Sequence, residues 1–215
     1  MSLVFDMTDP AERVRGLDAA TSAVRRGDLV VLPTDTVYGV GTDAFGTTGV
    51  SRLRAAKGMP AGAPLPVLVG SPTTMEGLGY GLTKAARSLV EAFWPGALTV
   101  VVKAQPTLAW DIGGTDGRVA LRMPLHPVAI ELLRATGPMA VTGANLAQRP
   151  QPATCLQARD QLGDSVTVYL DAGIGLDLPP STVVDASGEV PVVLRVGAVT
   201  VDTLREVCPQ VVEGQ

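Results

Sequence analysis

The sequence predicts a single α/β domain built on a twisted, open, mixed sheet with flanking helices. Segments with helical periodicity alternate with short apolar runs along the whole chain. Hydrophobic residues make up 46% of the 215 residues, which is enough for a large core. No internal repeat or low-complexity linker divides the chain, so we expect residues 1–215 to form one domain with its core over about 10–205.

Start signals and apolar spacing place the elements in order. Asp9 suits an N-cap, Pro10 the first helical position and Glu12 a capping box, and this helix is predicted to reach Gly27. Apolar residues at helical spacing predict further helices over 48–57, 83–93, 127–136, 154–162 and 201–207. Short apolar, β-branched runs predict strands over 29–32, 66–70, 98–103, 119–122, 139–142, 166–170, 182–185 and 192–196.

The segment 29–41, LVVLPTDTVYGVG, predicts a ligand site at the end of a strand. Residues 29–32 are all apolar, as in a strand covered on both faces, and Pro33 ends the strand. A polar loop is expected from there to Gly41. Its polar side chains are Thr34, Asp35, Thr36 and Tyr38. Because open α/β sheets bind ligands beyond the carboxyl ends of their strands, we predict that this loop contacts a small molecule.

Composition and charge narrow the classes of function. Seventeen basic residues against 21 acidic ones give a net charge of −4 without a dense run of either sign, so direct nucleic-acid binding is expected to be weak or absent. The two cysteines and the single histidine have no metal-ligand spacing, which predicts no metal site and fits a reducing cytoplasm. No apolar run reaches about 18 residues, so no membrane association is expected.

Three local features have more than one interpretation. Residues 39–44 match the dinucleotide pattern GxGxxA, but no acidic residue occurs in 46–74 to bind a ribose hydroxyl, so we attribute the match to chance. Lys57 closes a predicted helix before the glycine-rich loop 58–64, where its ammonium could hold a phosphate or stabilise the helix terminus. For His126, at a predicted helix start, capping, packing and catalysis are all open.

Ordered sequence blocks resemble the YrdC/Sua5 family. They are PTDTVYGVGTDAF from Pro33, the Ala-Lys-Gly segment at Lys57 with Pro64-Leu65, FWPGALTVVV, VALRMPLHP, the GAN at Gly143, STVVD from Ser181 and VLRVG around Arg195. The resemblance covers nearly the whole chain and implies a YrdC-like fold. It also implies a nucleotidyltransferase that combines L-threonine, bicarbonate and ATP into threonylcarbamoyl-AMP and pyrophosphate, for tRNA modification.

The resemblance further implies roles for individual side chains. Those that hold the amino acid or line its pocket are Thr34, Thr36, Tyr38, Arg122 and Ser181. Those assigned to the nucleotide are Lys57, Arg118, Asn145 and Arg195. Lys57 and Arg195 are also the catalytic candidates, because an anionic carbamate must attack a negatively charged phosphate and needs cations nearby. Mg²⁺ is expected to arrive with ATP, and partner proteins of tRNA modification are implied.

The chain departs from the family pattern at three nucleotide contacts. It has Met59, Ala63 and Gly143 where the family has arginine, asparagine and serine. The donors lost at Met59 and Gly143 are expected to slow an ATP-dependent step by roughly 10³-fold, unless another donor replaces them. Candidate replacements are Arg118, Arg149 and Gln151. Restoring Met59→Arg together with Gly143→Ser is expected to raise ATP affinity or turnover.

Two alternative hypotheses follow from these departures. One is a related enzyme that acts on another carbamate or carbamoyl-adenylate. The other is a non-catalytic YrdC-like module that binds double-stranded RNA or a partner protein, although the net charge of −4 disfavours RNA.

Overall fold

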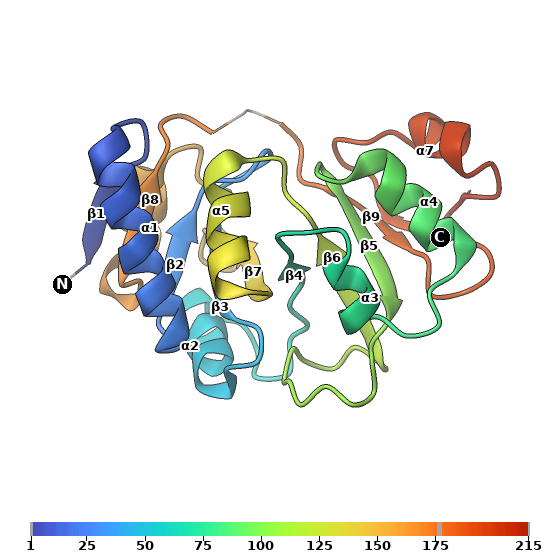
Figure 1. The fold of residues 1–215 in the computed structure, drawn as a ribbon, viewed down its shortest axis with the longest axis horizontal. Helices are drawn as coiled ribbons and strands as arrows, with labels where there is room; N and C mark the ends of the chain where they lie inside the picture. The colour runs from blue at the N-terminus through green and yellow to red at the C-terminus, as the bar shows by residue number, and fades with distance from the viewer. Residues whose placement is uncertain (1, 176–177, 215) are drawn as a thin grey trace.

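The computed structural model describes residues 2–175 and 178–214, whose strands form one 11-stranded sheet (Figure 1). From edge to edge the strands are β1 (Leu3–Asp6), β8 (Val168–Asp171), β2 (Val30–Leu32), β3 (Gly39–Asp43), β7 (Met139–Gly143), β4 (Val67–Leu68), β6 (Arg118–Arg122), β5 (Leu98–Lys103), β9 (Thr182–Asp185), β10 (Val192–Arg195) and β11 (Val212–Glu213). Parallel pairs such as β5–β9 and antiparallel pairs such as β3–β7 both occur. The prediction of a twisted, open, mixed sheet is confirmed.

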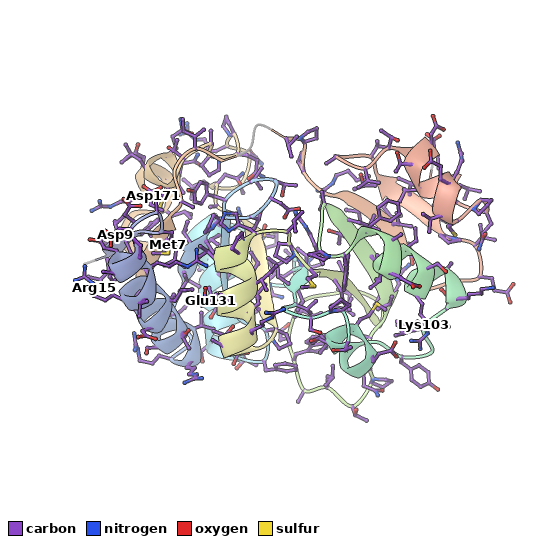
Figure 2. All side chains as sticks on the ribbon, turned by 45° about the horizontal axis from the view of Figure 1, so that its top comes forward. Met7, Asp9, Arg15, Lys103, Glu131 and Asp171 are labelled. Carbon is purple, nitrogen blue, oxygen red and sulfur yellow. The ribbon has the colours of Figure 1, made fainter. Side chains whose placement is uncertain are left out.

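Helices pack on both faces of this sheet. They are α1 (Pro10–Arg25), α2 (Thr47–Lys57), α3 (Thr74–Leu78), α4 (Lys84–Phe93), α5 (Pro127–Thr136), α6 (Cys155–Leu162) and α7 (Val201–Val207). On one face α1 and α5 lie side by side, and Arg13 forms a 2.7 Å ion pair with Glu131, which Figure 2 shows on α5. The other helices contribute to a second apolar cluster on the opposite face. Within the described residues, no helix has the length and apolar character needed to span a membrane.

The first helix begins where the sequence predicts. Asp9 Oδ1 accepts a 2.8 Å hydrogen bond from the N–H of Glu12, and Pro10 occupies the first turn. The carboxylate of Glu12 does not return to Asp9. It accepts a 2.8 Å hydrogen bond from the N–H of Asp6, which ties the helix to β1. Threonine hydroxyls cap α4, α6 and α7 in the same way, from Thr83, Thr154 and Thr200.

Strand β3 corrects the expectation of a loop up to Gly41. The predicted strand over 29–32 is confirmed as the buried β2, but residues 39–43 form a second strand between β2 and β7. A Cβ on Gly41 would lie 2.5 Å from Val141 Cγ2 and 2.6 Å from the carbonyl oxygen of Ala140. This close approach of two strands explains a glycine of the dinucleotide-like pattern, and it reduces the polar loop to residues 33–38.

Four short elements besides β3 are absent from the sequence prediction. They are β1, α3, the 3-10 helix η1 (Gly163–Ser165) and β11, which have four, five, three and two residues. Segments of this length span too few positions for a periodic pattern to identify them.

Side-chain alternation along the central strands gives one face of the sheet a polar patch. On β5, Val100 lies in the core and Thr99 points to the opposite face. On β6, Leu121 lies in the core and Arg122 points to the opposite face. Arg122 is aligned with Leu68 of β4, which belongs to the cluster beneath α1 and α5. Thr99 and Arg122 therefore lie on the face that carries these two helices.

The close approach of β3 and β7 at Gly41 can be tested by adding a single methyl group there. We expect Gly41→Ala to lower the free energy of unfolding by about 1–3 kcal/mol, because the added Cβ overpacks two strands. Gly77→Ala is the control, since a Cβ on Gly77 in α3 would meet nothing within 4 Å. Urea denaturation of both variants measures the difference, and equal stabilities would contradict this account of β3.

Candidate active site

A cavity of about 180 Å³ opens on the α1/α5 face, where distant segments of the chain meet. Its walls come from the loop after β2, from β3, β4, β5, β6 and β7, from Gln151, and from the residues just before β9 and at the end of β10. Five predicted site residues line it: Thr34, Thr36, Arg122, Ser181 and Arg195. The structure therefore brings together most of the residues assigned to the amino acid, with one cation assigned to the nucleotide.

Arg122 lines the cavity and connects three residues through hydrogen bonds from its guanidinium. Its Nη2 donates a 2.6 Å hydrogen bond to Asp35 Oδ1, in an ion pair whose side chains are only 8% and 10% exposed. Nη1 donates to Thr36 Oγ1 at 2.9 Å, and Nε donates to the carbonyl of Gly96 at 3.0 Å. Burial lowers the pKa of Arg122, Asp35 opposes this shift, and the nearby Arg195 lowers the pKa further. These contacts fix the guanidinium in one orientation.

Asp35 belongs to the polar loop that the sequence predicts to contact a ligand, and it is the only charged residue in 33–38. The sequence did not predict its pairing with Arg122, which places the carboxylate behind the cavity rather than in its lining. A carboxylate at a buried strand end needs a charged partner, and Arg122 is the partner that the fold supplies.

The loop that carries Asp35 is held by a turn at Thr34. Thr34 Oγ1 donates to the carbonyl of Val37 at 2.5 Å and accepts 3.2 Å hydrogen bonds from the N–H groups of Thr36 and Val37. The hydroxyl thus acts as a local backbone anchor, in addition to lining the cavity.

The second cation is fixed from the opposite wall. Arg195 Nε and Nη2 donate to the carbonyl of Ser181 at 3.2 and 2.8 Å, and Nη2 lies 3.3 Å from Ser181 Oγ. Ser181 Oγ is 2.8 Å from Thr99 Oγ1. Burial lowers the pKa of Arg195. Sequence reasoning missed Thr99, although a polar residue within an apolar strand is a recognisable signal.

Lys57 lies behind the cavity wall. Its ammonium, at the end of α2, donates to the carbonyl of Gly143 at 2.5 Å, to the carbonyl of Asn145 and to Asn145 Oδ1 at 3.3 Å. Asn145 Nδ2 in turn donates to the carbonyl of Arg149 at 2.8 Å. Lys57 and Asn145 therefore order the loop after β7. Lys57 does not line the cavity itself, but it holds the backbone of Gly143, which does. Their contact with a nucleotide stays a prediction.

Tyr38 does not line this cavity. Its hydroxyl donates to the carbonyl of Gly173 at 2.7 Å and accepts a 3.0 Å hydrogen bond from the N–H of Ala172. The ring is buried, and burial raises the pKa of the phenol. The structure thus uses Tyr38 to join β3 to the segment after β8.

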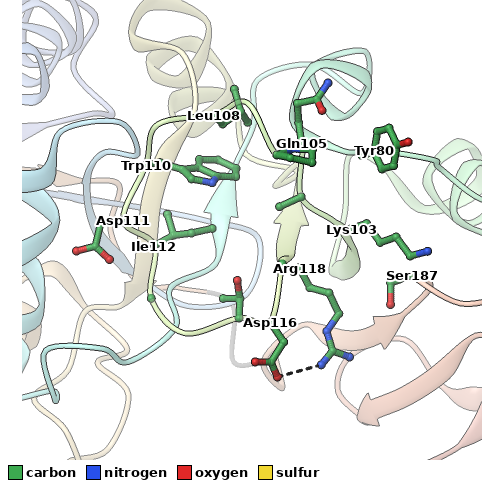
Figure 3. A pocket seen from close by; sticks show the side chains of 15 residues that line it. Tyr80, Lys103, Gln105, Leu108, Trp110, Asp111, Ile112, Asp116, Arg118 and Ser187 are labelled. Carbon is green, nitrogen blue, oxygen red and sulfur yellow. Dashed lines mark ion pairs between the residues drawn. The ribbon is translucent and has the colours of Figure 1, made fainter.

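Arg118 also lies apart from the other predicted residues. Figure 3 shows it in a different hollow, of about 670 Å³, whose walls include Trp110. Its guanidinium pairs with Asp185 at 2.9 Å and with Asp116 at 3.6 Å. Arg118 and Arg122 point to the same face of β6 but are four residues apart, which corresponds to roughly 13 Å. The structure does not bring Arg118 to the cavity that Arg122 lines.

The loop 58–64, where the resemblance implies an arginine and an asparagine, has its own anchor. Met59 packs against the apolar core, and its N–H donates to the carbonyl of Arg54 at 2.9 Å. The buried guanidinium of Arg54 donates to the carbonyls of Ala63 and Asp111 at 3.0 and 3.1 Å. This loop is therefore held by an internal arginine, which sequence reasoning missed.

His126 has no capping role. It occupies the N-cap position of α5, but its side chain makes no capping hydrogen bond. Its Nδ1 is buried and, among the described residues, has no hydrogen-bond partner. Burial lowers the pKa of this imidazole. Of the interpretations left open by the sequence, packing agrees best with this environment.

Comparison of the sequence with known proteins identifies a family. The model of the Sua5/YciO/YrdC family, described as "Telomere recombination", matches residues 22–197. A putative threonylcarbamoyl-AMP synthase of Mycobacterium tuberculosis is 53% identical over 207 residues, which are 96% of this chain and 95% of the relative. Threonylcarbamoyl-AMP synthase of Bacillus subtilis is 34% identical over 193 residues, which are 87% of this chain and 55% of that protein.

Solved structures share the fold. The Sua5 protein of Pyrococcus abyssi in complex with L-threonine matches with a TM-score of 0.91 and 30% identity. The match covers all of this chain and 62% of that one, so this chain spans less than two thirds of the archaeal protein. The YciO protein of E. coli matches with a TM-score of 0.83 over 95% of this chain, and at 23% identity it supports the fold alone.

The Arg122–Asp35 pair gives a testable stability difference. We expect Asp35→Asn to lower the free energy of unfolding by roughly 3 kcal/mol, because the guanidinium remains buried without its counter-charge. Asp116→Asn is the control, since Asp116 is 91% exposed and pairs loosely with Arg118. Chemical denaturation measures both variants. A loss for Asp35→Asn no larger than for the control contradicts the role of the buried pair.

The lowered pKa of Lys57 predicts that the stability of the chain depends on pH. Burial lowers its pKa from 10.5 to about 8, so between these pH values the unfolded chain holds more protons than the folded one. The contribution of Lys57 to the free energy of unfolding therefore rises as pH increases from 8 to 10.5. Urea unfolding at several pH values in this window should show a steeper rise for the unmodified chain than for Lys57→Met. Parallel curves would exclude the lowered pKa.

Proposed function

The chain belongs to the Sua5/YciO/YrdC family, and on that premise we propose that it is a threonylcarbamoyl-AMP synthase. The proposed reaction uses L-threonine, bicarbonate and ATP and yields threonylcarbamoyl-AMP, pyrophosphate and water. The single observation that carries the proposal is the small cavity lined by two guanidiniums, one of them paired with a carboxylate, and by five hydroxyl-bearing side chains.

The charge of the cavity suits its proposed substrate. Arg122 is balanced by Asp35, whereas Arg195 is held by the carbonyl and hydroxyl of Ser181, which carry no charge. The cavity therefore keeps an excess positive charge for a carboxylate or a carbamate. Its volume of about 180 Å³ is below the roughly 300–1,000 Å³ usual for drug-sized ligands, which favours an amino acid over a larger molecule.

The proposed chemistry proceeds in two balanced steps. The amine nitrogen of threonine forms a bond with the carbon of bicarbonate, and loss of water leaves a carbamate anion. A carbamate oxygen then attacks the α-phosphorus of ATP, and the bond from that phosphorus to the bridging oxygen of the β-phosphate breaks to release pyrophosphate. Both reactants of the second step are anions, so fixed cations and oriented donors lower its barrier more effectively than a strong base would.

The residues of this chain have separate parts in the proposal. Arg122 and Thr36 hold the threonine end from one wall, and Ser181 and Thr99 offer hydroxyls from the opposite wall. Arg195 stands beside the developing charge on phosphate, and Lys57 fixes the backbone of Gly143 at the cavity wall. Each group is anchored before a substrate arrives, so little reorganisation is needed.

The proposal extends to the setting of the reaction. Mg²⁺ enters as the ion that accompanies the phosphates of ATP. Residues 1–215 act as one YrdC-like domain in the cytoplasm, and proteins of tRNA modification take up the product. The family relatives named above give no observation that favours another carbamate or a non-catalytic RNA-binding module.

The test is threonine- and bicarbonate-dependent release of pyrophosphate by the purified chain. We expect Arg122→Lys to lower kcat/KM for threonine by about 10²-fold, because lysine cannot hold Asp35, Thr36 and Gly96 at once. Arg118→Lys, in the separate hollow, is the matched control and should stay within about threefold of the unmodified chain. A rate equal to that without enzyme would falsify the assignment.

A further inference from the structure

Gly143 leaves space that a second side chain fills. A Cβ on Gly143 would lie 2.3 Å from Oε1, 2.6 Å from Nε2 and 2.8 Å from Cδ of Gln151. The carboxamide of Gln151 therefore occupies the position that any larger residue at 143 would need. Both residues line the 180 Å³ cavity.

The backbone does not explain why residue 143 is a glycine. Gly143 ends β7, pairs with Gly39 of β3 and has a φ outside the left-handed region. Its carbonyl accepts the 2.5 Å hydrogen bond from Lys57, which holds this part of the strand in place. Any L-residue could adopt this backbone conformation. The feature that requires glycine is the room taken by Gln151.

The backbone just before Gln151 is anchored by two hydrogen bonds. The carbonyl of Pro150 accepts a 3.1 Å hydrogen bond from Gln161 Nε2, and the carbonyl of Arg149 accepts one of 2.8 Å from Asn145. In the part of the chain that the structure describes, no hydrogen bond joins the carboxamide of Gln151 to another protein group. A carboxamide has two N–H donors, and both are available to a ligand.

Gln151 also stands where two hollows meet. It lines the 180 Å³ cavity together with Arg195, and it lines a neighbouring hollow of about 570 Å³ together with Arg149. A ligand too large for the first hollow finds further room past Gln151 in the second. Arg195 lines the first hollow and Arg149 the second, so each hollow offers a guanidinium to phosphate oxygens, and Asp160 is the one acidic residue among the described residues that line the second.

We propose that the carboxamide of Gln151 donates a hydrogen bond to a phosphate oxygen of the nucleotide, in place of the serine hydroxyl that the family has at position 143. This inference rests on the proposed function and assigns one of its nucleotide contacts. Gly143 is the steric partner of that contact, because a side chain at 143 displaces the carboxamide. Gly143→Ser alone is therefore not expected to raise ATP affinity, which revises the expectation drawn from the sequence.

The test is calorimetric binding of an α,β-methylene analogue of ATP, which the proposed reaction cannot cleave. We expect Gln151→Ala to weaken binding roughly 10-fold or more, as for the loss of a hydrogen bond to a charged group. Gln151→Glu has the same shape but no N–H donor, and its carboxylate repels phosphate, so it should bind more weakly still. Gln210→Ala, at an exposed glutamine outside both hollows, should bind as the unmodified chain does.

A double-variant cycle separates a ligand contact from a structural effect. Gly143→Ala should weaken binding as much as Gln151→Ala, and the double variant should lose no more than either single one. Gly143→Ser combined with Gln151→Ala should recover to within about threefold of the unmodified chain, because the hydroxyl then has room. Urea unfolding should remain nearly unchanged throughout, since the carboxamide is the flexible end of an exposed side chain.

The outcomes distinguish this inference from the proposed function. Additive losses in the cycle, or an unchanged affinity of the Gln151→Glu variant, overturn the role of Gln151. In that case the proposed function still stands, provided that the unmodified chain binds the analogue. Failure of the unmodified chain to bind the analogue overturns both.

Discussion

The buried ion pair between Arg122 and Asp35 is the interaction on which the candidate site depends. It joins the loop after β2 to the end of β6, although β3, β7 and β4 lie between these strands in the sheet. Two charges removed from water are stable only when they are paired and their remaining hydrogen bonds are satisfied, and Thr36 and Gly96 supply those partners. The pair therefore determines both the shape of the polar loop and the direction of the guanidinium.

The cavity also depends on small residues at the centre of the sheet. Gly41 lets β3 approach β7 closely, and Gly143 at the end of β7 leaves room for the carboxamide of Gln151. A bulkier β3 would displace Val141, which lines the same cavity. Packing in the core and the geometry of the site are thus coupled through the same two strands.

Residues at and beside the predicted nucleotide contacts also make contacts within this chain. Met59 packs on the apolar core, and Arg54 anchors the loop that follows it. The ammonium of Lys57 donates to backbone carbonyls and to Asn145, so the backbone of Gly143 lies between this charge and the cavity. The cationic character of the cavity itself comes from Arg122 and Arg195, which lie on different strands and converge on one hollow.

The sequence by itself determined the α/β class, most helices and strands, and five of the residues that line the cavity, because periodicity, capping and ordered motifs are properties of neighbouring residues. Strand β3 was missed, since its glycines indicate a loop when its neighbours are unknown. Only the tertiary structure paired Asp35 with Arg122, 87 residues away, separated Arg118 from the cavity, and set Gln151 against Gly143. Such contacts are decided by strand order and side-chain volume, which no local pattern in the chain contains.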